Sequence, residues 1–210
     1  MKNNTVWGYL LVLTVVVFSF GGLQVQAQTT ADAWFKQGNA RSQAGNFPAA
    51  IEAYSKALAM QPTHAGAYYN RGTVRSNVKE YVDAVADFSK AIELNPEFAE
   101  AYLNRALAYV QLKNLDAALA DYDKVIELKP EYEKAYNNRG LARYRLKQYK
   151  GAIQDYNKAI ALKADYADAY YNRGAARYAL GDKNGACTDW QRARLFGVAK
   201  ATALIQKLCQ

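Results

Sequence analysis

The stretch that decides the fold is residues 65–98, AGAYYNRGTVRSNVKEYVDAVADFSKAIELNPEF, followed at residues 99–132 by a second version, AEAYLNRALAYVQLKNLDAALADYDKVIELKPEY. The same 34-residue pattern fills the chain five times, with copies that begin at Ala31, Ala65, Ala99, Glu133 and Ala167. Within each copy the apolar residues recur at helical spacing and not at strand spacing. Each copy therefore predicts a pair of helices, and the chain predicts an array of such pairs.

Several positions of the repeat keep one kind of residue in every copy. Positions 4 and 24 are aromatic: Trp34, Tyr68, Tyr102, Tyr136 and Tyr170, then Tyr54, Phe88, Tyr122, Tyr156 and Trp190. Position 8 is small: Gly38, Gly72, Ala106, Gly140 and Gly174. Small residues let two helices approach closely, and the aromatic rings fill the space beside them. Proline at position 32 of the first three copies predicts where each second helix ends.

These columns resemble the tetratricopeptide repeat (TPR), a helix–turn–helix unit of about 34 residues, over about four-fifths of the chain. The resemblance implies an all-α fold, a right-handed α-solenoid of eleven helices, because one helix pair buries its apolar face only by stacking on a neighbour. We expect five repeats and a C-terminal capping helix, at residues 31–64, 65–98, 99–132, 133–166, 167–200 and 198–210.

Residues 1–27 differ in composition from the repeats. Lys2 precedes an almost wholly apolar run over residues 6–20, and Val25-Gln26-Ala27 is a small-residue cleavage motif. This pattern predicts a secretory signal peptide, followed by a short linker at residues 28–30. The alternative is a retained membrane anchor, although the run is shorter than the ~20 residues that span a bilayer. We therefore expect an exported protein, periplasmic or secreted, with no stable membrane insertion after cleavage.

Charge and composition favour no enzymatic or nucleic-acid function. The formal net charge is +8, which could attract nucleic acid or an anionic membrane. However, Lys and Arg are spread through the repeats without a basic run, so we expect no nucleic acid as partner. One histidine, His64, and two cysteines without metal spacing give no catalytic, cofactor or metal site. The resemblance likewise implies a non-catalytic scaffold that binds a protein or peptide partner, whose identity the sequence does not give.

By the same resemblance, the first helix of each repeat lines a concave groove. Asparagine occupies position 6 in four repeats, once every 34 residues, and a primary amide can pair with the N–H and C=O of an extended peptide backbone. A member of this family carries a similar asparagine ladder. The candidate groove residues are Asn70, Asn104, Asn138, Asn172, Asn39, Phe35, Tyr69, Tyr144, Tyr171 and Tyr178. The alternative for the asparagines is that they bond to neighbouring helices. The alternative for the function is a role in assembly, through the convex face or by self-association.

An Arg and an Asp occur together in four repeats. Position 7 is Arg and position 23 is Asp in repeats 2–5, whereas repeat 1 has Gln37 and Ala53. This joint presence and absence predicts one ion pair within each repeat: Arg71–Asp87, Arg105–Asp121, Arg139–Asp155 and Arg173–Asp189. The alternative is that both side chains are half-exposed and contribute under ~1 kcal/mol.

The two cysteines lie at similar distances from Gly197, where the last repeat turns into the capping helix. Cys187 is ten residues before it and Cys209 twelve after it, so two antiparallel helices place them at similar heights. In an oxidising compartment this arrangement predicts a disulfide. The alternative is a small core residue at Cys187 and a frayed terminus at Cys209.

Overall fold

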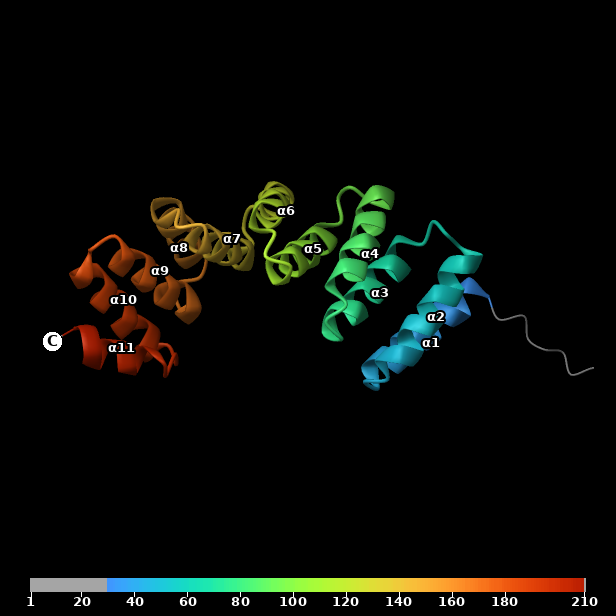
Figure 1. The fold of residues 1–210 in the computed structure, drawn as a ribbon, viewed down its shortest axis with the longest axis horizontal. Helices are drawn as coiled ribbons and strands as arrows, with labels where there is room; N and C mark the ends of the chain where they lie inside the picture. The colour runs from blue at the N-terminus through green and yellow to red at the C-terminus, as the bar shows by residue number, and fades with distance from the viewer. Residues whose placement is uncertain (1–29, 210) are drawn as a thin grey trace, which may run out of the picture.

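A computed structural model describes residues 30–209 as eleven α-helices, with no strand in that part of the chain, so the all-α prediction is confirmed (Figure 1). The predicted signal peptide and its cleavage site lie outside the described residues. The helices are α1 (Ala31–Gln43), α2 (Phe47–Met60), α3 (Ala65–Asn77), α4 (Tyr81–Leu94), α5 (Ala99–Gln111), α6 (Leu115–Leu128), α7 (Glu133–Arg145), α8 (Tyr149–Leu162), α9 (Ala167–Ala179), α10 (Lys183–Leu195) and α11 (Ala201–Leu208).

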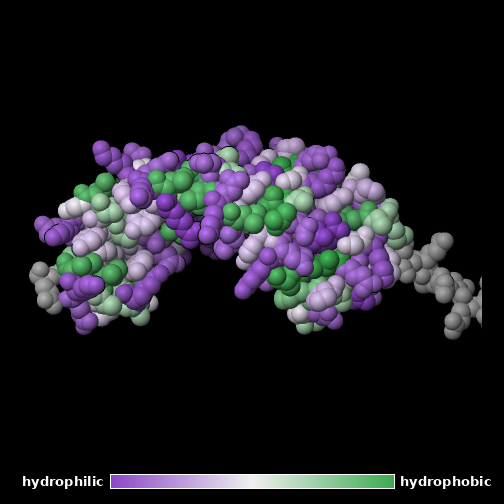
Figure 2. Space-filling model, viewed as in Figure 1, coloured by the Kyte–Doolittle hydropathy of each residue, from purple (hydrophilic) through white to green (hydrophobic). Residues whose placement is uncertain are grey.

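The helices stack in chain order into an elongated arch, with α1 at one end and α11 at the other (Figure 1). Each helix packs mainly on its neighbours in sequence, and odd-numbered helices also meet across repeats, as α1 meets α3 and α7 meets α9. Because a stack curves toward the row whose members lie closest, the odd-numbered helices form the inner row. The even-numbered helices form the outer row, and the arch is hollowed on one side (Figure 2).

The turn inside each repeat has one recurring backbone conformation. A residue with positive φ follows the first helix: Gly45, Lys79, Lys113, Lys147 and Gly181. The next N–H donates to the carbonyl five residues back, as from Glu80 to Arg75 at 2.9 Å. This is the Schellman arrangement that ends many helices. Three lysines therefore occupy a left-handed conformation that glycine adopts at lower cost.

Tight contacts between position 8 and position 24 explain the small-residue column. A Cβ added to Gly140 would lie 2.7 Å from the ring of Tyr156, and one added to Gly38 would lie 2.5 Å from Tyr54. The glycines thus let the aromatic ring of the second helix lie directly on the backbone of the first. Repeat 3 has Ala106 at this place, and that alanine is fully buried beside Tyr122.

Four of the five second helices end at the same repeat position, with or without proline, and α10 ends one residue earlier, at Leu195. Helices α2, α4 and α6 end two residues before Pro62, Pro96 and Pro130, and α8 ends at the equivalent Leu162 although Ala164 replaces the proline. The residue at position 34 helps to fix this loop, because its ring packs on position 5 of the same repeat. The centroids of Tyr69 and Phe98 are 4.7 Å apart.

The capping helix covers the last repeat and is joined to it by a disulfide. Helix α11 begins at Ala201, three residues later than the pattern suggested, and Leu204, Ile205 and Leu208 pack on the Trp190 cluster. Cys187 and Cys209 are bonded, with their Cα atoms 5.7 Å apart.

None of the helices between residues 30 and 209 is long and apolar enough to cross a membrane.

Candidate functional site

The inner row of helices carries two cavities near its N-terminal end. One, of about 300 Å³, lies over α1 and α3 and is lined by residues that include Asn39, Tyr69 and Asn70. The other, also of about 300 Å³, lies over α3 and α5 and is lined by residues that include Asn104 and Leu107. The inner face is therefore a shallow, mixed polar and apolar groove, in the place where the candidate residues were expected.

Three of the four position-6 asparagines donate hydrogen bonds to the preceding repeat. The Nδ2 of Asn70 donates to Oδ1 of Asn39 at 2.8 Å, and that oxygen also accepts from the Tyr54 hydroxyl at 2.8 Å. The Nδ2 of Asn104 donates to the hydroxyl of Tyr69 at 3.0 Å. These bonds tie adjacent inner helices together.

The last asparagine of the column follows the same rule. The Nδ2 of Asn172 donates to Oδ1 of Asn137 at 3.1 Å, and Asn137 is buried, with 6% of its surface exposed. Asn70, Asn104 and Asn172 therefore make structural contacts between repeats, which is the alternative interpretation of the asparagine column. Amides committed in this way are poorly suited to pair with a ligand.

Asn138 is the exception within residues 30–209. Its amide makes no hydrogen bond to repeat 3, and its oxygen has only a long contact of 3.5 Å from Asn137 on its own helix. The cause is the residue that it should meet, because position 5 of repeat 3 is Leu103, where repeats 2 and 4 have Tyr69 and Asn137. Leucine offers no polar atom, so the amide of Asn138 is free on a half-buried site.

Most of the candidate aromatic residues pack within the solenoid. Phe35 lies on His64, with ring centroids 4.5 Å apart, and Tyr144 lies on Tyr149 at 5.4 Å. Tyr171 lies under the ammonium of Lys200, 4.1 Å from its ring centroid. Burial also raises the pKa of Tyr69 above that of a free tyrosine. These rings are half-buried parts of the stack and are only partly available to a partner.

Two apolar side chains of the inner helices do reach solvent. Leu107 is 40% exposed, and Tyr178 is 37% exposed although its ring packs on Trp190. Leu107 was not among the candidate residues. The signal that could have identified it is position 9, which is polar in repeats 1 and 2 (Asn39 and Thr73) and leucine in repeats 3 and 4.

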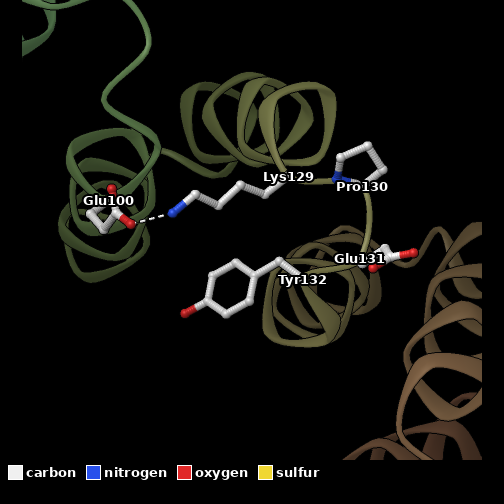
Figure 3. A pocket seen from close by; sticks show the side chains of 5 residues that line it. All are labelled: Glu100, Lys129, Pro130, Glu131 and Tyr132. Atoms are coloured by element: carbon white, nitrogen blue, oxygen red, sulfur yellow. Dashed lines mark hydrogen bonds and ion pairs between the residues drawn. The ribbon is translucent and has the colours of Figure 1, made fainter.

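A further cavity, of about 710 Å³, opens beside repeat 3 (Figure 3). Its lining comes from the start of α5 and the loop between α6 and α7, with Glu100, Lys129 and Tyr132 among its residues. Lys129 reaches across to form an ion pair with Glu100, and that hydrogen bond lowers the pKa of the carboxyl. Repeat 3 has Leu103 where repeats 1 and 2 have a ring that stacks on position 34, so Tyr132 lacks the stacking ring found at this place in those repeats.

The structure brings each predicted Arg and Asp together within one repeat. Arg71 donates to both carboxylate oxygens of Asp87 at 2.9 and 2.6 Å, and the other three pairs have the same double contact. The four aspartates are buried: Asp87, Asp121, Asp155 and Asp189. Each of these arginines also lies against the position-4 tyrosine, as Arg173 lies 5.3 Å from the ring centroid of Tyr170.

The network extends further than the sequence interpretation suggested. A second arginine, at position 11, donates to the same aspartate in three repeats, as Arg143 donates to Asp155 at 2.8 Å. The first arginine also reaches position 25 of the preceding repeat, as Arg139 reaches Asp123 at 2.7 Å. Position 11 is arginine in four of five repeats, and that column is the signal that could have revealed it.

The described residues contain no group of three or more His, Cys, Asp or Glu that could hold a metal ion. His64 caps α3, because its Nδ1 accepts from the N–H of Ala67 at 3.1 Å. The arrangement offers backbone-directed hydrogen bonding and apolar contact, and we find no catalytic constellation in residues 30–209.

The fold and the groove define a class, the helical-repeat solenoids. Two family models match the chain: "Tetratricopeptide repeat" at residues 65–98 and 99–132, and "TPR repeat" at residues 30–77 and 142–181. Together with the repeat geometry, these matches show that the chain belongs to the tetratricopeptide repeat family, whose members in general are interaction scaffolds. No curated protein matched the chain.

Solved structures of other TPR proteins superpose closely. A crystal structure of MamA is 26% identical, with a TM-score of 0.77 over 83% of this chain and 95% of that one. MamA from Desulfovibrio magneticus RS-1 is 19% identical, with a TM-score of 0.76 over 79% and 94%. YrrB, described as a TPR protein with an unusual peptide-binding site, is 21% identical, with a TM-score of 0.76 over 87% and 94%.

Proposed function

We propose that this protein is a non-catalytic scaffold that binds an extended segment of a protein partner along its inner groove. The observation that carries the proposal is the free amide of Asn138 beside the apolar Leu103 and Leu107, at the joint between repeats 3 and 4. A carboxamide offers a donor and an acceptor to a peptide backbone. The exposed Leu107 offers contact to one apolar side chain of the bound segment.

The joint between repeats 3 and 4 also offers charged side chains to the bound segment. Glu100 precedes Leu103 by one helical turn on α5, and its ion pair with Lys129 borders the cavity of Figure 3. An exposed ion pair is weak, so either charge can exchange its partner for an opposite charge on the ligand. The preferred ligand is therefore an extended peptide with an apolar residue and a nearby charged group.

We place this activity outside the cytoplasm, with the N-terminal segment acting as an export signal. The disulfide between Cys187 and Cys209 supports this location, because such bonds persist in oxidising compartments.

The test is binding to an array of unstructured peptides, followed by affinity measurement for the peptides retained. Asn138→Ala should weaken binding about fivefold, the loss of ~1 kcal/mol for one hydrogen bond, without lowering thermal stability. Leu107→Glu should weaken it further, whereas the matched control Val82→Glu, on an exposed residue of α4, should not. Unchanged affinity in both groove variants would reject the site.

Replacing all four asparagines is not a clean test of binding. Asn70, Asn104 and Asn172 hold neighbouring inner helices together, so their loss should lower stability as well as any binding. Asn104→Ala therefore serves as the contrast to Asn138→Ala. We expect it to reduce the unfolding temperature, while Asn138→Ala leaves it unchanged.

A further inference from the structure

The charge of the solenoid is divided unevenly along its length. Residues 133–210 contain 15 Lys and Arg against 6 Asp and Glu, whereas residues 30–132 contain 11 against 13. Two acids of the basic half, Asp155 and Asp189, are buried and each is bound by two arginines. With these two acids and their four arginines set aside, the basic half still has 11 Lys and Arg against 4 Asp and Glu.

The remaining basic side chains of this half project into solvent. Among residues 30–209, none of them lies within ion-pair distance of an acidic side chain. They are Lys134, Arg145, Lys147, Lys150, Lys158, Lys163, Lys183, Arg192, Arg194, Lys200 and Lys207, all exposed. Repeats 4 and 5 with the capping helix therefore present a concentrated positive field at one end of the arch.

One column of the outer helices shows the change from repeat to repeat. Position 26 is basic in all five repeats. In the first three its ammonium pairs with a glutamate on the same helix, at 2.6, 2.7 and 2.7 Å: Lys56–Glu52, Lys90–Glu93 and Lys124–Glu127. These glutamates stand at position 22 or position 29, and repeats 4 and 5 have no acid at either place. Position 22 is Gln154 and Thr188, and position 29 is Ala161 and Leu195. Lys158 and Arg192 are thus left without a counter-charge.

The same outer stripe ends in an exposed apolar residue. Leu195 lies one turn after Arg192 on α10 and is 70% exposed, at a position that is alanine or glutamate in the other repeats. We define the basic outer face as the exposed side chains of Lys150, Lys158, Arg192 and Leu195. It lies on the row opposite the inner groove.

We propose that the basic outer face adsorbs the protein to an anionic membrane surface. Each Lys or Arg near such a surface adds attraction without needing a specific partner, which suits charges spaced one repeat apart on separate helices. A projecting leucine between cations can enter the lipid interface while its neighbours stay at the headgroups. The inner groove stays open to solvent in this orientation, so adsorption and peptide binding are independent.

The test is flotation of the full chain with phosphatidylcholine vesicles that contain or lack phosphatidylglycerol, at increasing NaCl. The N-terminal apolar stretch is the same in every variant, and binding to phosphatidylcholine alone measures its contribution. We expect binding to anionic vesicles that weakens with salt. The double variant Lys158→Gln, Arg192→Gln should weaken it about 25-fold, about fivefold for each charge removed.

The matched control is Lys56→Gln, Lys90→Gln, which lowers the net charge equally at the same repeat position in repeats 1 and 2. It should weaken vesicle binding less than about fivefold, because the surface is local. Thermal unfolding of both variants checks that the fold is intact. Equal losses in the two double variants, or equal binding to vesicles with and without phosphatidylglycerol, would overturn the proposal. Tighter binding to soluble polyglutamate than to anionic vesicles would also overturn it, in favour of an acidic polypeptide partner.

Discussion

The ion pair of repeat 3 allows a direct measurement of what the buried Arg–Asp pairs contribute to stability. Arg105 donates to both oxygens of Asp121 at 2.8 and 2.7 Å, and its third nitrogen donates to the Ser89 hydroxyl at 2.9 Å. Tyr109 occupies the position where three other repeats have a second arginine for the aspartate. The Asp121 hydrogen bond raises the pKa of Arg105. In repeat 3 a single arginine, Arg105, therefore binds the buried carboxylate of Asp121.

We expect Asp121→Ala and Arg105→Gln each to lower the free energy of unfolding by about 3 kcal/mol, because each leaves a buried charge without its partner. The double variant recreates Gln37 and Ala53, the residues that repeat 1 has at these positions. It leaves no stranded charge, so it should cost less than the sum of the single changes by about 2 kcal/mol, within the range measured for contacting residues.

Urea unfolding followed by far-UV circular dichroism measures all four proteins, and an unchanged m-value shows that the same transition is compared. The double-mutant cycle gives the interaction energy directly. An interaction energy below about 0.5 kcal/mol would refute the argument, because it is the value expected of a solvent-exposed pair.

Three further outcomes follow from individual contacts. The Tyr156 hydroxyl is buried without a hydrogen-bond partner within the described residues, so Tyr156→Phe should raise unfolding stability by about 1 kcal/mol, whereas Tyr54→Phe, which loses the bond to Asn39, should lower it. Reduction of the disulfide, which joins residues 22 apart, should lower stability in urea by about 3 kcal/mol. Burial raises the pKa of Tyr122 and of Tyr156 above the ordinary tyrosine value. Because the unfolded chain loses these protons at lower pH than the folded protein, the free energy of unfolding should fall as the pH rises above about 10. Urea unfolding at a series of alkaline pH values measures this fall.

The sequence predicts the helices and the pairing within each repeat because both are periodic. A glycine that recurs opposite an aromatic ring marks a close contact between two helices. Gly72 is an example, because a Cβ added to it would lie 2.9 Å from the ring of Phe88. An Arg and an Asp that are present together and absent together mark a contact in the same way. Repetition within one chain supplies five trials of the same local structure, so a column that changes in one repeat can be compared with the column that changes beside it.

The partners between repeats are less predictable, because the acceptor changes its position. Asn70 bonds to position 9 of the preceding repeat, whereas Asn104 and Asn172 bond to position 5. The asparagine column is regular, but the residues that it meets are an asparagine, a tyrosine and a buried asparagine. A single column therefore gives the type of side chain and leaves open whether its amide is directed to the next helix or to a ligand.

Proline at the helix end shows a related limit. Ala164 stands in the place of proline after α8, yet α8 ends at the same repeat position as the helices that are followed by proline. The N–H of Lys163 still bonds to the carbonyl of Ala159 at 2.9 Å, and the N–H of Tyr166 to that of Lys163 at 3.0 Å. The loop is fixed by these bonds and by packing of its aromatic residue, so proline is compatible with the turn and is not required for it.

Repeat 3 is irregular at several positions, and two of its irregularities share one physical cause, Leu103. Leu103 replaces a residue that elsewhere is aromatic or carries an amide, so it removes a ring from the stack with Tyr132 and an acceptor from Asn138. The first loss leaves Tyr132, which lines the cavity of Figure 3, without a stacking ring, and the second leaves an amide free. A solenoid gains stability from every satisfied contact between neighbours, so an unsatisfied joint lowers that gain. An extended peptide that supplies the missing backbone bond and apolar contact would restore it, and the joint between repeats 3 and 4 is therefore where binding should raise the stability of the whole arch most.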